Sequence, residues 1–287
     1  MKSVSKFHLQ KITYLKYLPN GLVASCSADS TIYVWNSYTW VLIKKYLEHT
    51  KEVYCIDQID NDILVSASYD WTLRIWKINT GQTISKIDLL SMAYAVKVLP
   101  NGLIACGLVG IPENLVIYNY TTQTALHTLV GQSKTIYTIE LLSDDLMASG
   151  SFDTTIIVWN ITTFKYKYNF TGHTDRVFCI KRLTSNLVAS ADRPGNILVW
   201  DWLTNSIVHR FSGPNAHSNT LWTSSLALFG EQILISGSVD KTLKFWNISS
   251  GQLVQTIVVD FQINALAMLK TGSELKKNIY NFLHYRP

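Results

Sequence analysis

The sequence predicts an all-β fold built from repeated four-stranded antiparallel sheets, and a recurring phrase is the first observation that predicts it. In three places the phrase reads VSASYDWTLRIW, MASGSFDTTIIVW and LISGSVDKTLKFW. It and its more divergent copies end at Trp35, Trp76, Tyr118, Trp159, Trp200 and Trp246. Successive ends lie 41, 42, 41, 41 and 46 residues apart. Such a fixed period indicates a series of similar structural units.

The second observation is that each period contains four short β signals. In the second unit they fall at about 52–59, 63–68, 72–77 and 83–88. Turn residues such as Asn, Asp and Gly separate these segments, and β-branched and aromatic residues fill them. No ten-residue stretch of helical periodicity interrupts the series, so a parallel sheet of βαβ units is not expected.

A sheet of about 41 residues cannot bury both of its faces alone, but sheets stacked radially cover one another. At this point the repeated phrase S-x-S-x-D-x-T-[IL]-x-[IVF]-W resembles that of the WD-repeat β-propeller family, over residues 8 to about 260. The resemblance implies a β-propeller of four-stranded antiparallel blades within one domain, 1–287. The expected repeats are 8–47, 48–90, 91–130, 131–171, 172–212 and 213–260, with a degenerate partial repeat at 261–287.

The resemblance also implies a hydrogen-bonded His, Ser, Asp and Trp set, a tetrad, in each blade, because such a network holds the turn of the blade. The first unit offers His8, Ser25, Asp29 and Trp35, and the second His49, Ser66, Asp70 and Trp76. The later units offer incomplete sets: Ser149, Asp153 and Trp159; His173, Ser190 and Trp200; and Ser236, Asp240 and Trp246.

Several units depart from the pattern. Gln132 replaces the histidine of the fourth unit, Pro194 occupies the aspartate position of the fifth, and an insertion displaces His217 in the sixth. In the third unit Ser91 replaces the histidine and Tyr118 replaces the tryptophan.

The end of the chain leaves the number of blades open. Residues 263–269 have the pattern of an innermost strand, an irregular strand is expected near 278–285, and residues 2–7 could add an outer strand. We therefore expect seven blades, the last one incomplete, with six blades and a C-terminal tail as the alternative.

Function is expected at positions that vary between units, because loops on a rigid scaffold carry binding. At the entry of the innermost strand, in most units five residues after the tetrad histidine position, the units present Thr13, Tyr54, Tyr94, Tyr137, Phe178, Trp222 and Asn264. In the family this position lines the top face around the channel mouth, together with the residue two before it and the residue before the turn aspartate. The resemblance therefore adds Lys11, Glu52, Met92, Thr135, Arg176 and Thr220, then Tyr69, Phe152 and Val239, and with less support Arg193.

Composition argues against several other classes of protein. The net charge of +5 is spread along the chain, so nucleic-acid binding is not expected. The four cysteines lie far apart in apolar runs, which predicts buried thiols and neither a metal site nor a cofactor. The N-terminus has no signal-peptide pattern and no 18-residue apolar run occurs, which predicts an intracellular protein, in the cytoplasm or alternatively the nucleus, with no membrane association.

These observations predict a scaffold that is not an enzyme and binds a protein or peptide through the top face. The Ser, His and Asp residues recur at the same offsets in several units, whereas a catalytic triad occurs once. Two alternatives stay open: an aromatic cage for a methylated lysine at Tyr54, Tyr94 and Glu52, and a small-molecule site in the central channel. The aromatic residues could also simply pack between blades.

Overall fold

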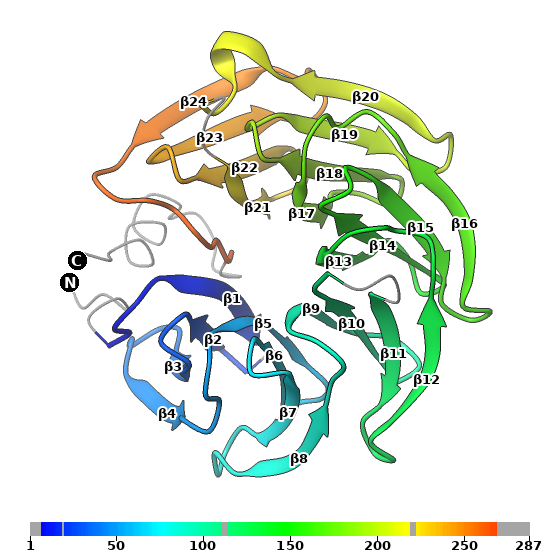
Figure 1. Ribbon diagram of the computed structural model, residues 1–287. Helices are drawn as coiled ribbons and strands as arrows, with labels where there is room; N and C mark the ends of the chain where they lie inside the picture. Colours follow the sequence, from blue (N-terminus) through cyan, green and yellow to red (C-terminus); the bar gives the residue numbers. More distant parts are fainter. Residues whose placement is uncertain (1–6, 19, 111–113, 219–221, 269–287) are drawn as a thin grey trace.

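The computed structural model describes residues 7–268 except 19, 111–113 and 219–221. These residues form six four-stranded antiparallel sheets, which are arranged as blades around a central channel (Figure 1). This confirms the predicted fold class. We number the blades one to six in chain order.

Each blade consists of four strands that follow one another along the chain. Blades one to three contain β1 Ile12–Leu18, β2 Leu22–Ser27, β3 Ile32–Asn36, β4 Leu42–Tyr46, β5 Val53–Gln58, β6 Ile63–Ser68, β7 Thr72–Lys77, β8 Thr83–Asp88, β9 Ala93–Val98, β10 Ile104–Leu108, β11 Leu115–Asn119 and β12 Thr124–Leu129. Blades four to six contain β13 Ile136–Leu141, β14 Leu146–Ser151, β15 Ile156–Asn160, β16 Lys165–Phe170, β17 Val177–Arg182, β18 Leu187–Asp192, β19 Ile197–Asp201, β20 Ser206–Phe211, β21 Thr223–Phe229, β22 Ile233–Ser238, β23 Thr242–Asn247 and β24 Leu253–Val258.

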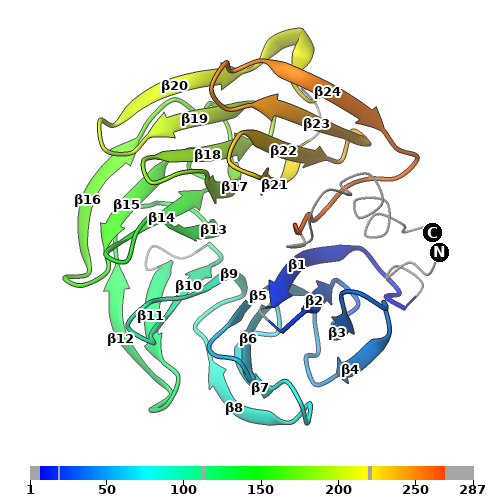
Figure 2. The ribbon, with the colours of Figure 1, turned by 180° about the vertical axis from the view of Figure 1, so that it is seen from behind.

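The order of strands runs from the centre of the ring to its outside, which both views show (Figures 1 and 2). The second and third strands are almost completely buried, because a neighbouring blade covers each of their faces. Outer strands such as β4 and β20 alternate between buried and exposed residues, since one of their faces meets solvent. This layering explains why the repeated phrase is so apolar: it spans the two middle strands.

Small residues on the second strands let adjacent blades approach closely. At one equivalent position in each blade, near the end of the second strand, the residues are Cys26, Ala67, Gly107, Gly150, Ala191 and Gly237. A Cβ atom on Gly107 would lie 2.7 Å from Ile136 Cγ2 and 2.9 Å from the Ile136 carbonyl oxygen. The spacing between blades three and four therefore depends on the absence of a side chain there.

A Gly107→Ala variant should accordingly be destabilised by about 2 kcal/mol, because the added methyl group meets a backbone atom that cannot rotate away. Urea unfolding followed by tryptophan fluorescence would measure the change. Gly131→Ala is the matched control, since its Cβ would meet only side-chain atoms, at 3.0 Å. Equal losses in both variants would contradict the explanation.

The segment after blade six occupies the position of a further innermost strand. A Cβ atom on Gly237 would lie 2.5 Å from Ile263 Cγ2, which is the same relation as that of Gly107 to Ile136 between blades three and four. The Ser224 hydroxyl donates to the Ile263 carbonyl, as Thr13 does to Val53 between blades one and two. Ile263 packs against blade six, and Ala265 packs against blade one.

The described part of this segment, up to Met268, forms no strand ladder. The residues expected to form a strand at 263–269 therefore occupy the place of an innermost strand without being one, as far as Met268. The other strands expected for a seventh blade, at 278–285 and 2–7, lie outside the described residues apart from Phe7. The described residues thus show six complete blades and the beginning of a seventh position in the ring.

A continuous chain of hydrogen bonds links the tetrad of blade two. Trp76 Nε1 donates to Ser66 Oγ at 2.7 Å, and Ser66 Oγ lies 2.7 Å from His49 Nε2. His49 Nδ1 lies 2.7 Å from a carboxylate oxygen of Asp70. Burial lowers the pKa of His49 although Asp70 opposes that shift, so the ring is neutral. Both of its nitrogens are hydrogen-bonded, and Nδ1 also lies 3.4 Å from the Thr72 hydroxyl. The serine hydroxyl is fully buried and already bonded, which excludes it as a nucleophile.

The same network joins the predicted residues of blade one, where His8 contacts Ser25 at 2.8 Å and Asp29 at 3.1 Å. Trp35 completes that set by donating to Ser25. In blade four Gln132 takes the histidine position: Ser149 donates to its Oε1 at 2.6 Å and Trp159 donates to the same serine at 2.7 Å. Here Asp153 binds the backbone N–H groups of Ser133 and Thr155 instead of an imidazole.

Two expectations about the tetrads were wrong. In blade five Asp192, not the residue at position 194, carries the carboxylate, which lies 3.0 Å from His173 Nδ1; His173 and Trp200 both contact Ser190. The aspartate has moved to the end of β18, where Gly195 allows a different turn with φ +86°.

In blade six His217 is not displaced from the network. Its Nε2 lies 2.7 Å from Ser236 and its Nδ1 lies 2.9 Å from Asp240, while Trp246 donates to Ser236. Histidine and serine are 19 residues apart here and 17 apart in blades one, two and five. The loop before β21 therefore absorbs the two extra residues and leaves the tetrad intact.

Blade three lacks the tetrad. Tyr118 is buried at the tryptophan position, and Ser91 donates to the carbonyl of Val109. Asn114 instead donates to the backbone carbonyls of Gln132 and Lys134, which ties blade three to the start of blade four.

Candidate functional site

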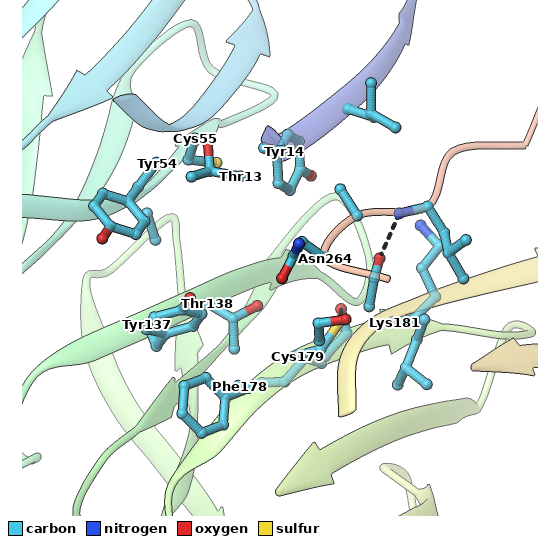
Figure 3. A pocket seen from close by; sticks show the side chains of 18 of the residues that line it. Thr13, Tyr14, Tyr54, Cys55, Tyr137, Thr138, Phe178, Cys179, Lys181 and Asn264 are labelled. Atoms are coloured by element: carbon cyan, nitrogen blue, oxygen red, sulfur yellow. Dashed lines mark hydrogen bonds between the residues drawn. The ribbon is translucent and has the colours of Figure 1, made fainter. Parts of the chain in front are cut away.

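A β-bulge at the start of each innermost strand positions the candidate side chains. The pairing of first and second strands skips one residue in every blade: Thr13, Tyr54, Tyr94, Tyr137, Phe178 and Ser224. A bulged residue leaves the alternation of the strand and can be aimed elsewhere. Figure 3 shows Tyr54, Tyr137 and Phe178 around one cavity, together with Thr13 and Asn264.

This register corrects the expected position of Trp222. The bulged residue of blade six is Ser224, and Trp222 lies two residues before it, because blade six has two extra residues before β21. The backbone carbonyl of Trp222 accepts from Val239, just as that of Glu52 accepts from Tyr69. Trp222 is thus the counterpart of Lys11, Glu52, Met92, Thr135 and Arg176, and Thr220 lies outside the described residues.

Seven aromatic rings nevertheless form one continuous surface at the mouth of the channel, which we call the aromatic belt: Tyr54, Tyr69, Tyr94, Tyr137, Phe152, Phe178 and Trp222. Adjacent ring centroids lie 4.5 to 6.0 Å apart, mostly in edge-to-face or tilted arrangements. These are the favourable geometries for aromatic pairs. All seven rings are half-buried, so the belt is both packed and accessible. Val239, by contrast, is buried and does not contribute.

Burial keeps the hydroxyl groups of three belt tyrosines neutral by raising their pKa. Burial, followed by the proximity of Tyr94 and Glu52, raises the pKa of Tyr54 to about 12. Burial likewise raises the pKa of Tyr69 and of Tyr137. Charge at the mouth therefore comes from other residues.

Those residues are mainly cations. Lys11, Arg176 and Arg193 line the mouth and are exposed, and Arg193 donates its backbone N–H to the Arg176 carbonyl, so the two arginines are neighbours. The Arg176 guanidinium lies 4.8 Å from the centre of the Phe152 ring, a cation–π contact that fixes it over the belt. Glu52 is half-buried at the equivalent position of blade two.

Below the belt lies a channel with a volume of about 580 Å³. The residue after each bulge faces it, and this residue is small in six positions of the ring: Cys55, Ala95, Thr138, Cys179, Ser225 and Ala265. In blade one it is Tyr14, whose large side chain extends into the space that the small residues leave (Figure 3).

Deeper in the channel, charged side chains alternate from blade to blade, a feature that the sequence-based expectations missed. Lys16 pairs with Asp57, while Glu140 accepts from both Lys97 and Lys181 at 2.9 Å. Burial by itself would raise the pKa of Glu140, but Lys97 and Lys181 outweigh it and hold the pKa well below its usual range. The signal that could have found these five residues is their own spacing, which is close to the repeat period.

The described residues contain no group of three or more His, Cys, Asp or Glu side chains that could hold a metal ion. Three of the four cysteines are buried, Cys179 is half-buried, and burial raises the pKa of each thiol. Within the same part of the chain, no helix is long and apolar enough to cross a membrane.

Comparison with known proteins gives a family and several partial relatives. The family described as WD domain, G-beta repeat matches residues 2–36, 40–77, 123–160, 164–201 and 206–247. An E3 ubiquitin-protein ligase COP1 of Pisum sativum is 24% identical over 54% of this chain and 24% of its own length. Protein SPA1-RELATED 3 of Arabidopsis thaliana is 28% identical over 47% of this chain and 16% of its own length.

A third relative, eukaryotic translation initiation factor 3 subunit I of Schizosaccharomyces pombe, is 32% identical over 28% of this chain and 25% of its own length. The matched region thus spans a quarter or less of each of these relatives.

Proposed function

Because the chain belongs to the WD-repeat β-propeller family, we propose that it is a non-catalytic scaffold that binds a protein or peptide at the channel mouth. Propellers of this family typically serve as protein-interaction scaffolds. The finer parts of the proposal are the site, which is the aromatic belt, and an intracellular place of action. One relative is by its name a subunit of an initiation factor, which supports a role within a larger assembly.

The aromatic belt is the observation that carries the proposal. Tyrosine, tryptophan and arginine are enriched among the residues that dominate binding energy, because they offer large rigid surfaces with polar ends. Here four tyrosines, one tryptophan, two phenylalanines and Arg176 gather at one end of the channel, on bulged or loop positions that the blade does not need for its own ladder. A role in packing alone would not require these rings to stay half exposed.

The alternative of a methyl-lysine cage is less well supported. A cage needs an open space between its aromatic walls, into which the ammonium group can enter. The rings of Tyr54, Tyr69 and Tyr94 contact one another instead, with centroids 4.5, 4.5 and 5.1 Å apart. Lys11, Arg176 and Arg193 would also repel a cationic ligand.

The test is a triple variant, Tyr54→Ala, Tyr137→Ala and Trp222→Ala, used as bait in affinity purification with mass spectrometry. We expect the proteins captured by the unchanged chain to be lost at least tenfold, since hot-spot residues each carry about 2 kcal/mol or more.

The matched control is Tyr38→Ala with Tyr166→Ala, which removes exposed rings far from the mouth and should leave capture unchanged. Circular dichroism would establish that the triple variant is folded. A folded triple variant that captures the same proteins would show that the belt is not the binding surface.

A further inference from the structure

The mouth of the channel carries positive charge that forms no ion pair with a carboxylate in the described part of the chain. Lys11, Arg176 and Arg193 are exposed, and none of the three has an ion-pair partner among the described residues. The carboxylates at this end include Asp175, whose Oδ1 accepts from the Arg176 backbone N–H at 2.7 Å, and Glu52 on blade two, and neither forms an ion pair with the three cations. Arg176 and Arg193 belong to blade five and Lys11 belongs to blade one. The three cations therefore lie on the side of the mouth where Asn264 also lines the channel.

The same end of the ring has further cations. In an antiparallel blade the connection into the first strand and the turn between the second and third strands lie at one end. Lys51 and Lys134 precede β5 and β13, and Lys241 lies in the turn between β22 and β23. All three are exposed and have no ion-pair partner in the described part of the chain.

The opposite end is acidic. The loops between the first and second strands contain Asp60, Asp62, Asp144, Asp145 and Glu231. Only Asp62 of these has an ion-pair partner among the residues that the structure describes, Lys77 at 3.8 Å. The turns at the mouth end also hold the tetrad carboxylates of Asp29, Asp70, Asp153 and Asp240, but each of these is hydrogen-bonded within its own blade. The cations at the mouth have no such partner among the described residues, so they attract an anionic ligand to the end with the aromatic belt.

The cations do not stand alone: they lie over apolar surface. Arg176 rests on Phe152, whose ring contacts Phe178, and Phe178 stacks on Trp222 with centroids 5.9 Å apart. An aliphatic or aromatic side chain can pack on these rings while a carboxylate beside it reaches the guanidinium groups. A cavity of about 580 Å³ has room for one or two side chains but is too narrow for a folded domain.

From this arrangement we propose that the partner of the mouth is an acidic peptide segment, in which an aspartate or glutamate beside an apolar side chain is held by Arg176 and Arg193 over the Phe152, Phe178 and Trp222 rings. The inference rests on the proposed function and adds the chemistry of the partner. Bidentate pairing of arginine with carboxylate supplies direction, and the rings supply the buried area.

A single-stranded nucleic acid is the other anionic polymer that could be considered, and the geometry favours it less. Base stacking requires aromatic faces that are open and separated by about one base. The rings of the aromatic belt instead pack against each other, with centroids 4.5 to 6.0 Å apart, and leave no space of that width between them. The unpaired cations also surround a hole and do not follow a groove.

The experiment is selection of a random dodecapeptide library displayed on phage against the 287-residue chain. We expect enriched peptides to contain Asp or Glu within two residues of an aromatic or aliphatic side chain. Arg176→Glu with Arg193→Glu should weaken binding of a synthetic enriched peptide at least tenfold in fluorescence anisotropy. Raising the salt concentration from 50 to 500 mM should weaken binding to the unchanged chain as well.

The matched control, Lys165→Glu with Arg182→Glu, changes the charge by the same amount at the acidic end and should leave affinity unchanged. Peptides that lose binding in the triple aromatic variant but are neutral or basic would overturn the acidic partner and leave the proposed function standing. Peptides whose binding is indifferent to the aromatic variant, or no enrichment at all, would count against both. A labelled oligothymidine that binds more tightly than the best peptide, and depends on Arg176 and Arg193, would replace the peptide by a nucleic acid.

Discussion

A Ser66→Ala variant is expected to lose about 3 kcal/mol of unfolding free energy, because one hydroxyl holds two other buried groups of blade two. Trp76 Nε1 donates to Ser66 Oγ and His49 Nε2 contacts the same oxygen, each at 2.7 Å. Without the hydroxyl both nitrogens remain buried and unpaired, and each such group costs about 1–3 kcal/mol. Urea unfolding followed by tryptophan fluorescence would measure the loss.

The same blade provides a matched control. The hydroxyl of Ser85, on the outer strand β8, is also buried but has no hydrogen-bond partner. Ser85→Ala removes the same atom without breaking a bond, so stability should stay within about 0.5 kcal/mol of the unchanged chain or rise. Similar losses at Ser66 and Ser85 would mean that the tetrad contributes nothing beyond the volume of an oxygen atom.

A Glu140→Gln variant should lose about 3 kcal/mol at pH 7, because it leaves Lys97 and Lys181 facing each other without their carboxylate. This figure is at the lower end for broken buried pairs, since Lys181 is 38% exposed and its charge is partly screened by solvent. Chemical unfolding at pH 7 would measure the loss. Glu231→Gln is the control, as Glu231 is exposed at the end of the ring away from the mouth.

The effect should also depend on pH in a definite direction. The pKa of Glu140 is lower in the folded chain than in the unfolded chain, where it is about 4.3. A carboxylate of this kind stabilises the fold above the unfolded pKa, and the contribution is lost as the pH falls below it. The gap between the unchanged chain and Glu140→Gln should therefore be full at pH 7 and shrink between about pH 5 and pH 3. A gap that grew towards acid pH would contradict the assignment.

Much of the fold could be predicted because the information is local and repeated. The Ser, Asp and Trp residues of a tetrad lie within ten residues of one another, and the histidine follows from a fixed offset of 17. That offset placed His8 and His49 correctly. It wrongly excluded His217 from the tetrad of blade six, because two inserted residues change the offset to 19 while the histidine still contacts the serine.

The candidate site was harder to predict from the sequence, because fixed offsets fail where a loop or turn changes length or where residues of different blades meet. Counting five residues from the histidine position found the bulged aromatic residues of blades two, four and five, whereas Tyr94 of blade three lies only three residues after Ser91. In blade six the same count gave Trp222 in place of Ser224. Asp192 escaped because the turn of blade five moves its carboxylate by two positions. The channel charges escaped because Glu140 pairs with residues 43 positions before it and 41 after it, on separate blades.

The sequence by itself determined that this protein is a ring of four-stranded blades with a shared buried network, because each unit repeats the residues that form its own strands and turn. Only the tertiary structure decided which residues meet at the channel. Loop length sets the register in which each unit enters the ring, and contacts between units join residues about one period apart that no local pattern connects. The aromatic belt, the unpaired cations above it and the charged residues below it are properties of the closed arrangement of blades, since every one of them is assembled from several units.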